Sequence, residues 1–346
     1  MAYTTINKSS LHMNTKLFTG TGSENAITGI GFQPDWVWFK SRTNTEHHKL
    51  YDAVRGVQKT LYSNLDNASY TDAQSLKSFG SDGYTVGTES AINGNGQSIV
   101  SWNWKANGQG SANTDGTINS TYTSANTTSG FSIIQYTGTG SAGTVGHGLD
   151  QTLDAVIVKK TSGDEDWNVW FRAETPKIGI LNDGAAFYSP GAAGINGPTI
   201  TSDVVGLGTS ATANGSGATY VAYCFAEKQG YSKFGSYVGN GSTDGTFVYT
   251  GFKPAWIMFK DLRSGQSWNM YDNKRSPINF VDERLRANLN GAEVQDTGSS
   301  DMDFVSNGFK LRNNWDQLNS SGQTIIYMAF AAAPLVGTNN IPANAR

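Results

Sequence analysis

Cysteine, charge and long apolar runs are all scarce in this chain, and each scarcity excludes a class of protein. Cys224 is the one cysteine, so no internal disulfide framework can hold the fold together. The net charge of −3 offers no electrostatic attraction to nucleic acid or to an anionic membrane surface. No apolar run approaches the ~18 residues of a membrane-spanning helix, and residues 1–10 lack the apolar core of a signal peptide. We therefore expect a protein that folds in a reducing cytosol, with no nucleic acid as partner and no membrane insertion.

Motifs for catalysis and metal binding are also scarce. The chain contains no G-x-S-x-G nucleophile motif, phosphate-binding loop or dinucleotide-binding fingerprint. Carboxylates gather at residues 164–166 and again at Asp301 and Asp303; they would suit half of a glycosidase pair or a calcium site, but we favour solvated loop charge. The histidines have no metal-ligand spacing to another acid or cysteine, and they are His12, His47, His48 and His147. From the sequence we therefore predict a protein that is not an enzyme and that has no catalytic residues, metal site or cofactor.

What the sequence has in abundance is repetition. An opening phrase that ends in Gly-x-Gly-Ser occurs at residues 18–23, 136–141 and 237–242. A strand-like phrase at residues 32–40 returns nearly intact at 252–260 and loosely at 153–159. The copies lie about 100 residues apart, which is the size of a domain and not of a solenoid repeat. We infer three copies of one module.

The closing segment of each copy predicts an antiparallel strand. In the segments that end at Trp104, Phe225 and Phe330, every second residue is bulky, so the bulky residues share one face. This period of two is typical of a strand that lies on a core. A glycine-rich turn, which we interpret as a hairpin, precedes these segments at residues 93–96, 214–217 and 320–322. No helical stripe longer than about two turns is visible. The predicted fold class is all-β, with three tandem antiparallel jelly-roll-like β-sandwich modules.

Composition sets the predicted boundaries. A stretch rich in Gly, Ser, Thr and Asn separates the first two copies and indicates a solvated linker, whereas the joint between the second and third copies is short. The predicted parts are an N-terminal arm at 1–16, modules at 17–107, 131–230 and 231–334, a polar linker at 108–130 and a C-terminal tail at 335–346.

The strand from Trp36 to Phe39 is apolar on both faces, as is its counterpart from Trp256 to Phe259. A sandwich strand with one solvated face should instead alternate with polar residues. We expect central strands covered by a neighbouring module or a crossing loop; the alternative is an aromatic platform that stacks on sugars. Because such strands need a covering surface, we also predict a homo-oligomer, with a trimer favoured by analogy to fibre proteins.

The repeat also assigns a role to the paired histidines. His47 and His48 occupy the place where the other copies have Asp-Trp at 166–167 and Ser-Trp at 267–268. A position that accepts tryptophan elsewhere favours packing or a rim position over metal ligation.

Several longer phrases resemble, as a set, a family of repeat proteins from tailed bacteriophages. In the first copy they are Gly-Phe-Gln-Pro-Asp-Trp-Val-Trp at 31–38, Tyr-Asp-Ala-Val-Arg-Gly-Val at 51–57 and Phe-Gly-Ser-Asp-Gly-Tyr at 79–84. Phrases at 220–227, 230–237, 249–256 and 341–346 extend the similarity over essentially the whole chain. Members of this family, common in phages of marine bacteria, are described as virion or tail-fibre-like proteins with lectin-like β-sandwich modules. The resemblance implies a virion protein made in the host bacterial cytoplasm, with other virion proteins as partners and no catalytic residues to transfer.

The resemblance leads us to expect a non-enzymatic phage virion structural protein. The favoured role is an adhesin of the tail or tail fibre that contacts host surface glycan. The alternative is a capsid decoration or cement protein, which the short segment ahead of the first module favours because a long fibre normally carries a separate attachment domain. A polysaccharide-degrading enzyme is a remote alternative, since no carboxylate pair is apparent.

One loop differs between the copies in a way that indicates ligand contact. Ahead of the third closing segment the chain places an aromatic ring among amide and carboxylate groups, whereas the matching loops at 90–92 and 209–211 have no aromatic residue. A ring beside hydrogen-bonding side chains is the usual arrangement for stacking on a sugar. The predicted glycan-binding residues are Asn313, Asn314, Trp315 and Asp316. The alternative for Trp315 is an anchor against another subunit.

Overall fold

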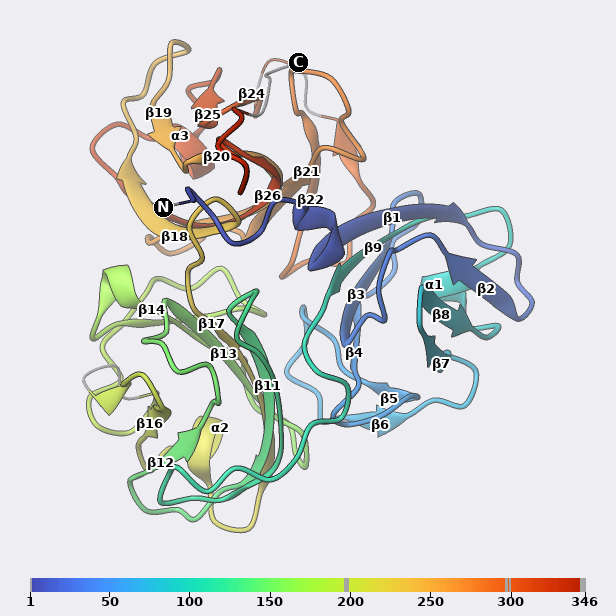
Figure 1. The fold of residues 1–346 in the computed structure, drawn as a ribbon, viewed down its shortest axis with the longest axis vertical. Coiled ribbons are helices and arrows are strands. Elements are labelled where there is room, and N and C mark those ends of the chain that lie inside the picture. The colour runs from blue at the N-terminus through green and yellow to red at the C-terminus, as the bar shows by residue number, and fades with distance from the viewer. Residues whose placement is uncertain (1, 196–198, 296–297, 299, 343–346) are drawn as a thin grey trace.

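Three lobes surround a common centre in the computed structural model, which describes residues 2–342 apart from 196–198, 296–297 and 299 (Figure 1). Each lobe places a larger sheet towards the centre and a smaller sheet towards the outside. The strands pair antiparallel within these sheets, which form a β-sandwich-like architecture. The prediction of an antiparallel all-β fold is confirmed.

The strands follow the same order in every large sheet. In the first lobe the large sheet consists of β1 (Met13–Thr19), β9 (Ser98–Trp104), β3 (Trp36–Ser41) and β4 (Lys49–Asp52), and the small sheet of β2 (Asn25–Thr28), β8 (Gly83–Val86) and β7 (Leu76–Gly80). A ribbon of β5 (Lys59–Thr60) and β6 (Tyr70–Thr71) lies beside them. In every lobe the closing strand, such as β9, lies between the opening strand and the strand of the Trp36 phrase.

The second and third lobes extend this plan by further edge strands. The second lobe has β10 (Ser120–Asn126), β11 (Phe131–Thr137), β17 (Thr219–Phe225), β13 (Ala155–Lys160), β14 (Asn168–Phe171) and β15 (Ile178–Ile180), with β12 (Gly143–Gly146) and β16 (Val204–Leu207) outside. The third has β18 (Ser232–Val238), β26 (Thr324–Pro334), β20 (Phe252–Asp261), β21 (Asn269–Asp272), β22 (Glu283–Arg286) and β23 (Val294–Gln295), with β19 (Phe247–Tyr249), β25 (Gly308–Leu311) and β24 (Met302–Val305) outside.

The strands that are apolar on both faces serve two cores at once. In β3, Val37 and Phe39 lie in the core between the two sheets of the first lobe, whereas Trp36 and Trp38 lie in a central core shared by all three lobes. The alternation of side chains along a strand accounts for this division. The expectation that a neighbouring module covers these strands is confirmed. The surface that we expected a second subunit to cover is therefore covered within one chain.

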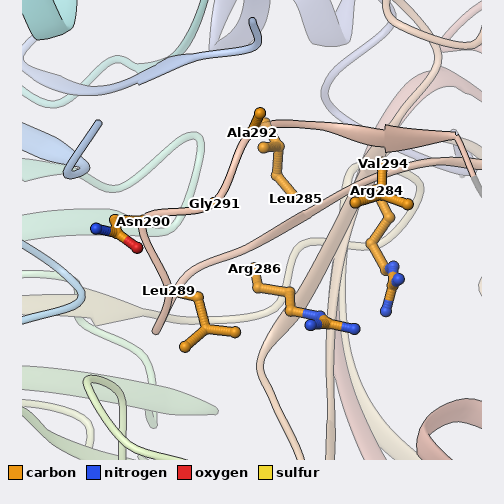
Figure 2. Close-up of a pocket in the computed structure, with 8 residues that line it drawn as sticks. All are labelled: Arg284, Leu285, Arg286, Leu289, Asn290, Gly291, Ala292 and Val294. Atoms are coloured by element: carbon orange, nitrogen blue, oxygen red, sulfur yellow. The ribbon is translucent and has the colours of Figure 1, made fainter. Parts of the chain in front are cut away.

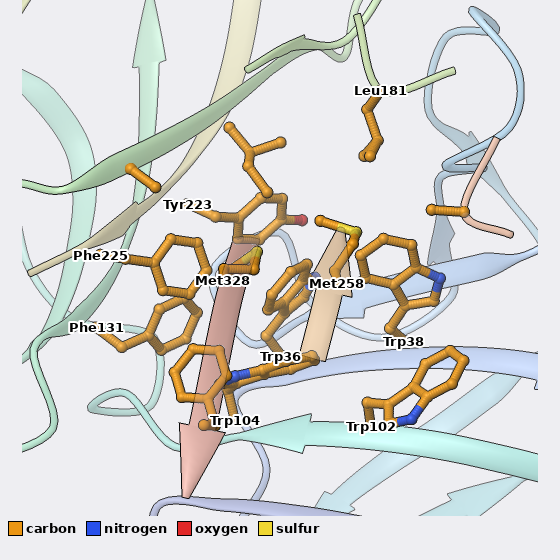
Figure 3. Close-up of a cluster of buried hydrophobic side chains, with 14 of the residues drawn as sticks. Trp36, Trp38, Trp102, Trp104, Phe131, Leu181, Tyr223, Phe225, Met258 and Met328 are labelled. Atoms are coloured by element: carbon orange, nitrogen blue, oxygen red, sulfur yellow. The ribbon is translucent and has the colours of Figure 1, made fainter. Parts of the chain in front are cut away.

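Side chains from all three lobes meet in the central core, where Figure 3 shows aromatic rings of the first two lobes beside Met258 and Met328 of the third. Trp36 of the first lobe stacks on Tyr223 of the second, with ring centroids 4.4 Å apart. Trp104 of the first lobe meets Phe330 of the third lobe with ring centroids 5.8 Å apart, so aromatic residues of two closing strands are neighbours at the centre; β26 continues past Phe330 to Pro334. Such pairs contribute about 0.5–1.5 kcal/mol each beyond the burial of their area.

A one-turn helix precedes each closing strand, where the glycine-rich turns had predicted a simple hairpin. The helices are α1 (Ser90–Asn93), α2 (Ala211–Asn214) and α3 (Asp316–Asn319). The final asparagine of each helix is buried and binds the opening phrase: the Asn93 side-chain carbonyl accepts from the Thr21 amide at 3.0 Å, as Asn214 does from Thr139 and Asn319 from Asn240. The prediction missed the helices because a single turn has no periodicity to detect.

This contact explains why the opening phrase must contain glycine. A Cβ atom on Gly20 would lie 2.2 Å from the Gly94 carbonyl oxygen, and the matching positions Gly138 and Gly239 have the same close approach. Gly22 has a φ of +68°, a conformation that favours glycine. The phrase therefore recurs for structural reasons.

The predicted linker at 108–130 is wrong in its second part. Strand β10 pairs with β11 along the edge of the second lobe, and Ile118 is buried in the core of that lobe. Polar composition indicated solvated chain, but an edge strand can carry polar residues: Thr123 and Ser124 of β10 are both buried.

The predicted N-terminal arm at 1–16 ends earlier, because β1 begins at Met13. The preceding residues include a 3-10 turn, η1 (Ser9–Leu11), and reach the third lobe. The Tyr3 hydroxyl donates to the Gly251 carbonyl at 2.8 Å, and Asn7 donates to Thr338 of the C-terminal tail at 3.2 Å. The arm thus connects the first lobe to the third; of the tail, residues 343–346 lie outside the described residues. No helix in the described part of the chain is long and apolar enough to cross a membrane.

Candidate functional site

The loop predicted to bind glycan precedes and enters α3 on the third lobe. Trp315 caps the start of this helix, where α1 and α2 have Glu89 and Ser210, so the structure places the ring at a position that the other lobes fill without an aromatic. One part of Trp315 packs against the core of the third lobe. The Arg284 guanidinium lies over the ring, 4.3 Å from its centroid. A sugar that stacked on this face would have to displace Arg284.

The four predicted residues do not face one common hollow. Asn313 is buried and donates to the Asp301 carbonyl at 2.8 Å, while its own side-chain oxygen accepts from the Trp315 amide at 2.9 Å. Asp316 is exposed and accepts from Arg263 at 3.0 Å, a charge that lowers the pKa of its carboxyl. Asn314 is exposed. Trp315, Asn314 and Asp316 therefore remain candidate contact residues, and Asn313 is a structural one.

In each lobe, the ring nitrogen of one Trp or His side chain forms a hydrogen bond with a backbone carbonyl of the neighbouring lobe. Trp167 Nε1 donates to the Tyr62 carbonyl at 2.8 Å, and Trp268 Nε1 donates to the Ile180 carbonyl at 2.8 Å. His48 takes the same place in the first lobe: its Nε2 lies 3.0 Å from the Arg286 carbonyl. Burial lowers the pKa of His48 well below its usual value. The Trp38 indole donates to His48 Nδ1 at 2.8 Å, so Nε2 carries the proton and donates to the Arg286 carbonyl. The packing role predicted for His48 agrees with this geometry.

At two of the three interfaces between lobes, a buried aspartate binds a residue of the neighbouring lobe. Between the first and second lobes, Tyr223 donates its hydroxyl to Asp52 at 2.8 Å, and the Asp52 carboxylate also pairs with Arg55 at 2.6 Å. Between the third and first lobes, Trp102 Nε1 donates to Asp272 at 2.9 Å, and Asp272 pairs with Arg275. We call these two clusters the aspartate latches.

The third interface has no latch at the corresponding position. Register places Phe171 of the second lobe where Asp52 and Asp272 lie in the others, and Met328 of the third lobe where Trp102 and Tyr223 lie. Both Phe171 and Met328 are buried in the central core. This interface is apolar where the other two are charged.

A buried lysine ends the Trp36 phrase and its two counterparts. Lys159 Nζ donates to the Asp66 carbonyl of the first lobe and to the Glu165 carbonyl, both at 2.8 Å. Lys40 and Lys260 are equally buried and bind carbonyls of the adjacent loops. Burial lowers the pKa of all three ammonium groups to about 8.

The carboxylate clusters and the cysteine have local structural partners. Asp164 accepts from the Ala68 amide at 2.8 Å across the interface between the first two lobes, and Asp303 pairs with Arg312 at 2.6 Å. Within the described residues, no group of three His, Cys, Asp or Glu side chains is placed to hold a metal ion. Cys224 is buried and its pKa is raised by burial, so its thiol is a packing group.

A pocket of about 240 Å³ opens beside β22 in the third lobe (Figure 2). It combines the guanidinium-bearing Arg284 and Arg286 with the exposed apolar side chains Leu289 and Val294. Arg284 also lies over Trp315, so one side chain both lines this pocket and contacts the predicted glycan loop.

Sequence reasoning missed the buried polar groups, some of which connect two lobes and some of which, like the asparagines of the short helices, act within one lobe. The signal was present for the lysines, which close all three copies of the strand phrase, and for the asparagines that end the short helices. The aspartate latches had a weaker signal: the phrase Tyr-Asp-x-x-Arg occurs at 51–55 and 271–275 but not in the second copy, and it does not indicate that Asp52 and Asp272 bind residues more than 150 positions away.

These features define a class: a cysteine-poor, all-β protein whose repeated lobes are joined by a shared aromatic core and by buried polar contacts. The chain belongs to the family described as Domain of unknown function (DUF7483), which matches residues 8–334. No curated protein and no solved structure matches the chain.

Proposed function

We propose that this chain is a non-enzymatic structural protein of a tailed-phage virion, built from three jelly-roll-like β-sandwich modules, and that it serves as an adhesin of the tail or tail fibre. The observation that carries the proposal is the union of three lobes around one aromatic core. The resemblance of the repeated phrases to phage repeat proteins supplies the virion setting. Buried polar and charged side chains hold the lobes to one another, as a rigid binding protein requires.

The threefold arrangement of the lobes supports attachment to a partner with threefold symmetry. Closed symmetric assemblies repeat one contact around an axis. Three lobes of one chain can approximate such a repeat while each lobe carries different loops. A fibre and a capsid shell both offer threefold positions, so the arrangement suits a tail and a head location alike.

Capsid decoration is the second candidate, and the geometry of the predicted glycan loop favours it. Asn313 is buried, and Arg284 covers a face of Trp315. Glycan contact at this loop therefore requires a rearrangement, which a decoration protein would not need.

Mass spectrometry and a cryo-electron microscopy map of purified virions test both candidates. We expect the protein in the particle, with three-lobed density at the tail or its fibres. Density on the head shell would select decoration over the adhesin. Absence of the protein from purified virions would overturn the proposed function.

A further inference from the structure

The outer sheet of each lobe ends in an edge strand, and the three edges differ. Val145 in β12 and Val248 in β19 face the cores of their lobes, as Ile27 does in β2. By register, Phe247 and Tyr249 of β19 correspond to Ala26 and Thr28 of β2 and to Thr144 and Gly146 of β12. The third lobe therefore presents two aromatic residues where the others present small ones.

The backbone groups of Phe247 and Tyr249 point away from their own sheet. The Leu311 amide donates to the Thr246 carbonyl at 3.1 Å, and the Thr250 amide donates to the Asn307 carbonyl at 2.9 Å. In an antiparallel pair the bonded positions alternate, so the N–H and C=O groups of Phe247 and Tyr249 face outward. Their side chains are 46% and 53% exposed.

The second lobe shows what such an edge can bind. Its β12 is paired by an additional segment of the same chain: the Ile118 amide donates to the Thr144 carbonyl at 2.8 Å, and the Thr144 amide donates to Thr117 Oγ1 at 2.9 Å. Thr144 is the counterpart of Phe247, so the outward groups at this position are bound by an uncharged stretch, Gly-Thr-Ile-Asn at 116–119, which bends at Gly116 and Thr117 and forms a β-bridge at Ile118. Gly116 lets the segment approach closely, since a Cβ there would lie 2.3 Å from the Thr144 carbonyl oxygen.

We propose that β19 is a docking edge to which an uncharged, extended segment of another virion protein adds as a strand, with apolar side chains packed on Phe247 and Tyr249. Strand addition supplies main-chain hydrogen bonds, and alternate side-chain contacts supply selectivity. A hollow of about 360 Å³ at the end of β19 extends the surface available to such a segment. Its lining includes Tyr3 and Tyr249 and also the charged Glu227 and Lys233, which pair with each other. That the partner is a virion protein rests on the proposed function. The exposed edge of β19 is a feature of the structure and does not depend on that proposal.

The experiment uses tagged copies of the full chain, expressed in the host during infection, that compete with the phage-encoded copy for places in the particle. The variant Phe247→Lys/Tyr249→Lys places charge on the docking edge. The matched control, Ala26→Lys/Thr28→Lys, makes the same change at the equivalent edge of the first lobe. We expect the tagged wild type and the control to enter purified virions equally, and the β19 variant to enter at least tenfold less, with an unchanged melting temperature for all three purified proteins.

Other outcomes separate this inference from the proposed function. Equal incorporation of the β19 variant, or a virion map with no additional strand along β19, would overturn the docking edge and leave the virion role standing. Failure of the tagged wild type and of the phage-encoded copy to appear in virions would overturn both. If purified wild type dimerises in sedimentation and the β19 variant does not, the occupant is a second copy and the proposal is wrong.

Discussion

Two of the lobe interfaces contain an aspartate latch, and the third has Phe171 and Met328 at the same positions. The three lobes share register and buried lysines, so the difference between their interfaces lies in the chemistry of a few side chains. A buried ion pair is costly to desolvate, and its removal in favour of well-packed apolar groups is often neutral or stabilising. The apolar interface shows that this fold does not need the latch for attachment of a lobe. The latches are better explained as devices that fix which surfaces meet.

The largest effect is expected from removal of one latch charge. Asp52→Asn keeps the volume of the side chain but leaves the buried Arg55 without its carboxylate, so we expect a loss of about 3–5 kcal/mol in the free energy of unfolding. Asp272→Asn should cost less, because Arg275 keeps Glu293 at 2.9 Å as a second partner. Urea unfolding of the full chain gives both values.

The matched change at the apolar interface is Phe171→Leu. It removes part of a buried hydrophobic side chain and should cost about 1–2 kcal/mol, less than the expected loss at Asp52. If Asp52→Asn is as mild as Phe171→Leu, the latch is not a strained charge pair and the contrast between the interfaces is wrong.

Conversion of one interface into the other sharpens the comparison. The triple variant Asp52→Phe/Arg55→Met/Tyr223→Met gives the first interface the apolar character of the third. We expect it to recover most of the stability that Asp52→Asn loses, since no charge is left buried without a partner. Differential scanning calorimetry tests this, and a triple variant less stable than Asp52→Asn would show that the latch contributes net stability.

A pH dependence should come from the buried lysine that all three lobes share. The folded chain releases protons from Lys40, Lys159 and Lys260 at a pKa of about 8, whereas an unfolded lysine has a pKa near 10.5. Between these values the unfolded chain binds more protons, so the free energy of unfolding rises with pH. We expect the melting temperature to increase from pH 8 to about pH 10. The rise should flatten in the variant Lys40→Met/Lys159→Met/Lys260→Met, whereas an unchanged rise would assign it to other groups.

Repetition in the sequence predicted the parts of the fold that every copy needs. It located the strand of Trp36, the closing strands and the packing position of His48, because a shared scaffold imposes the same residue types three times. It could not predict that Asp52 and Asp272 bind Tyr223 and Trp102 of another lobe, although each aspartate also pairs with an arginine of its own lobe. It also misassigned β10 as linker. An edge strand is held by backbone hydrogen bonds, which do not require apolar side chains, so its polar composition resembles that of a linker. Of the candidate glycan residues, Asn313 belongs to the scaffold, because its amide serves the fold.

The smallest change in stability is expected at Trp315, which distinguishes the third lobe from the other two. Trp315→Ala removes a partly buried ring and its contact with Arg284, and should cost about 1 kcal/mol, because exposed cation–π pairs contribute little. On the adhesin proposal, phage carrying this variant should adsorb more slowly to the host, while Trp315→Phe, which keeps an aromatic face, should retain most of the adsorption rate. Adsorption kinetics and particle counts measure the two effects separately. If Trp315→Ala particles fail to assemble, the ring is an interface anchor, and the third lobe is specialised for contact with another virion protein instead of with glycan.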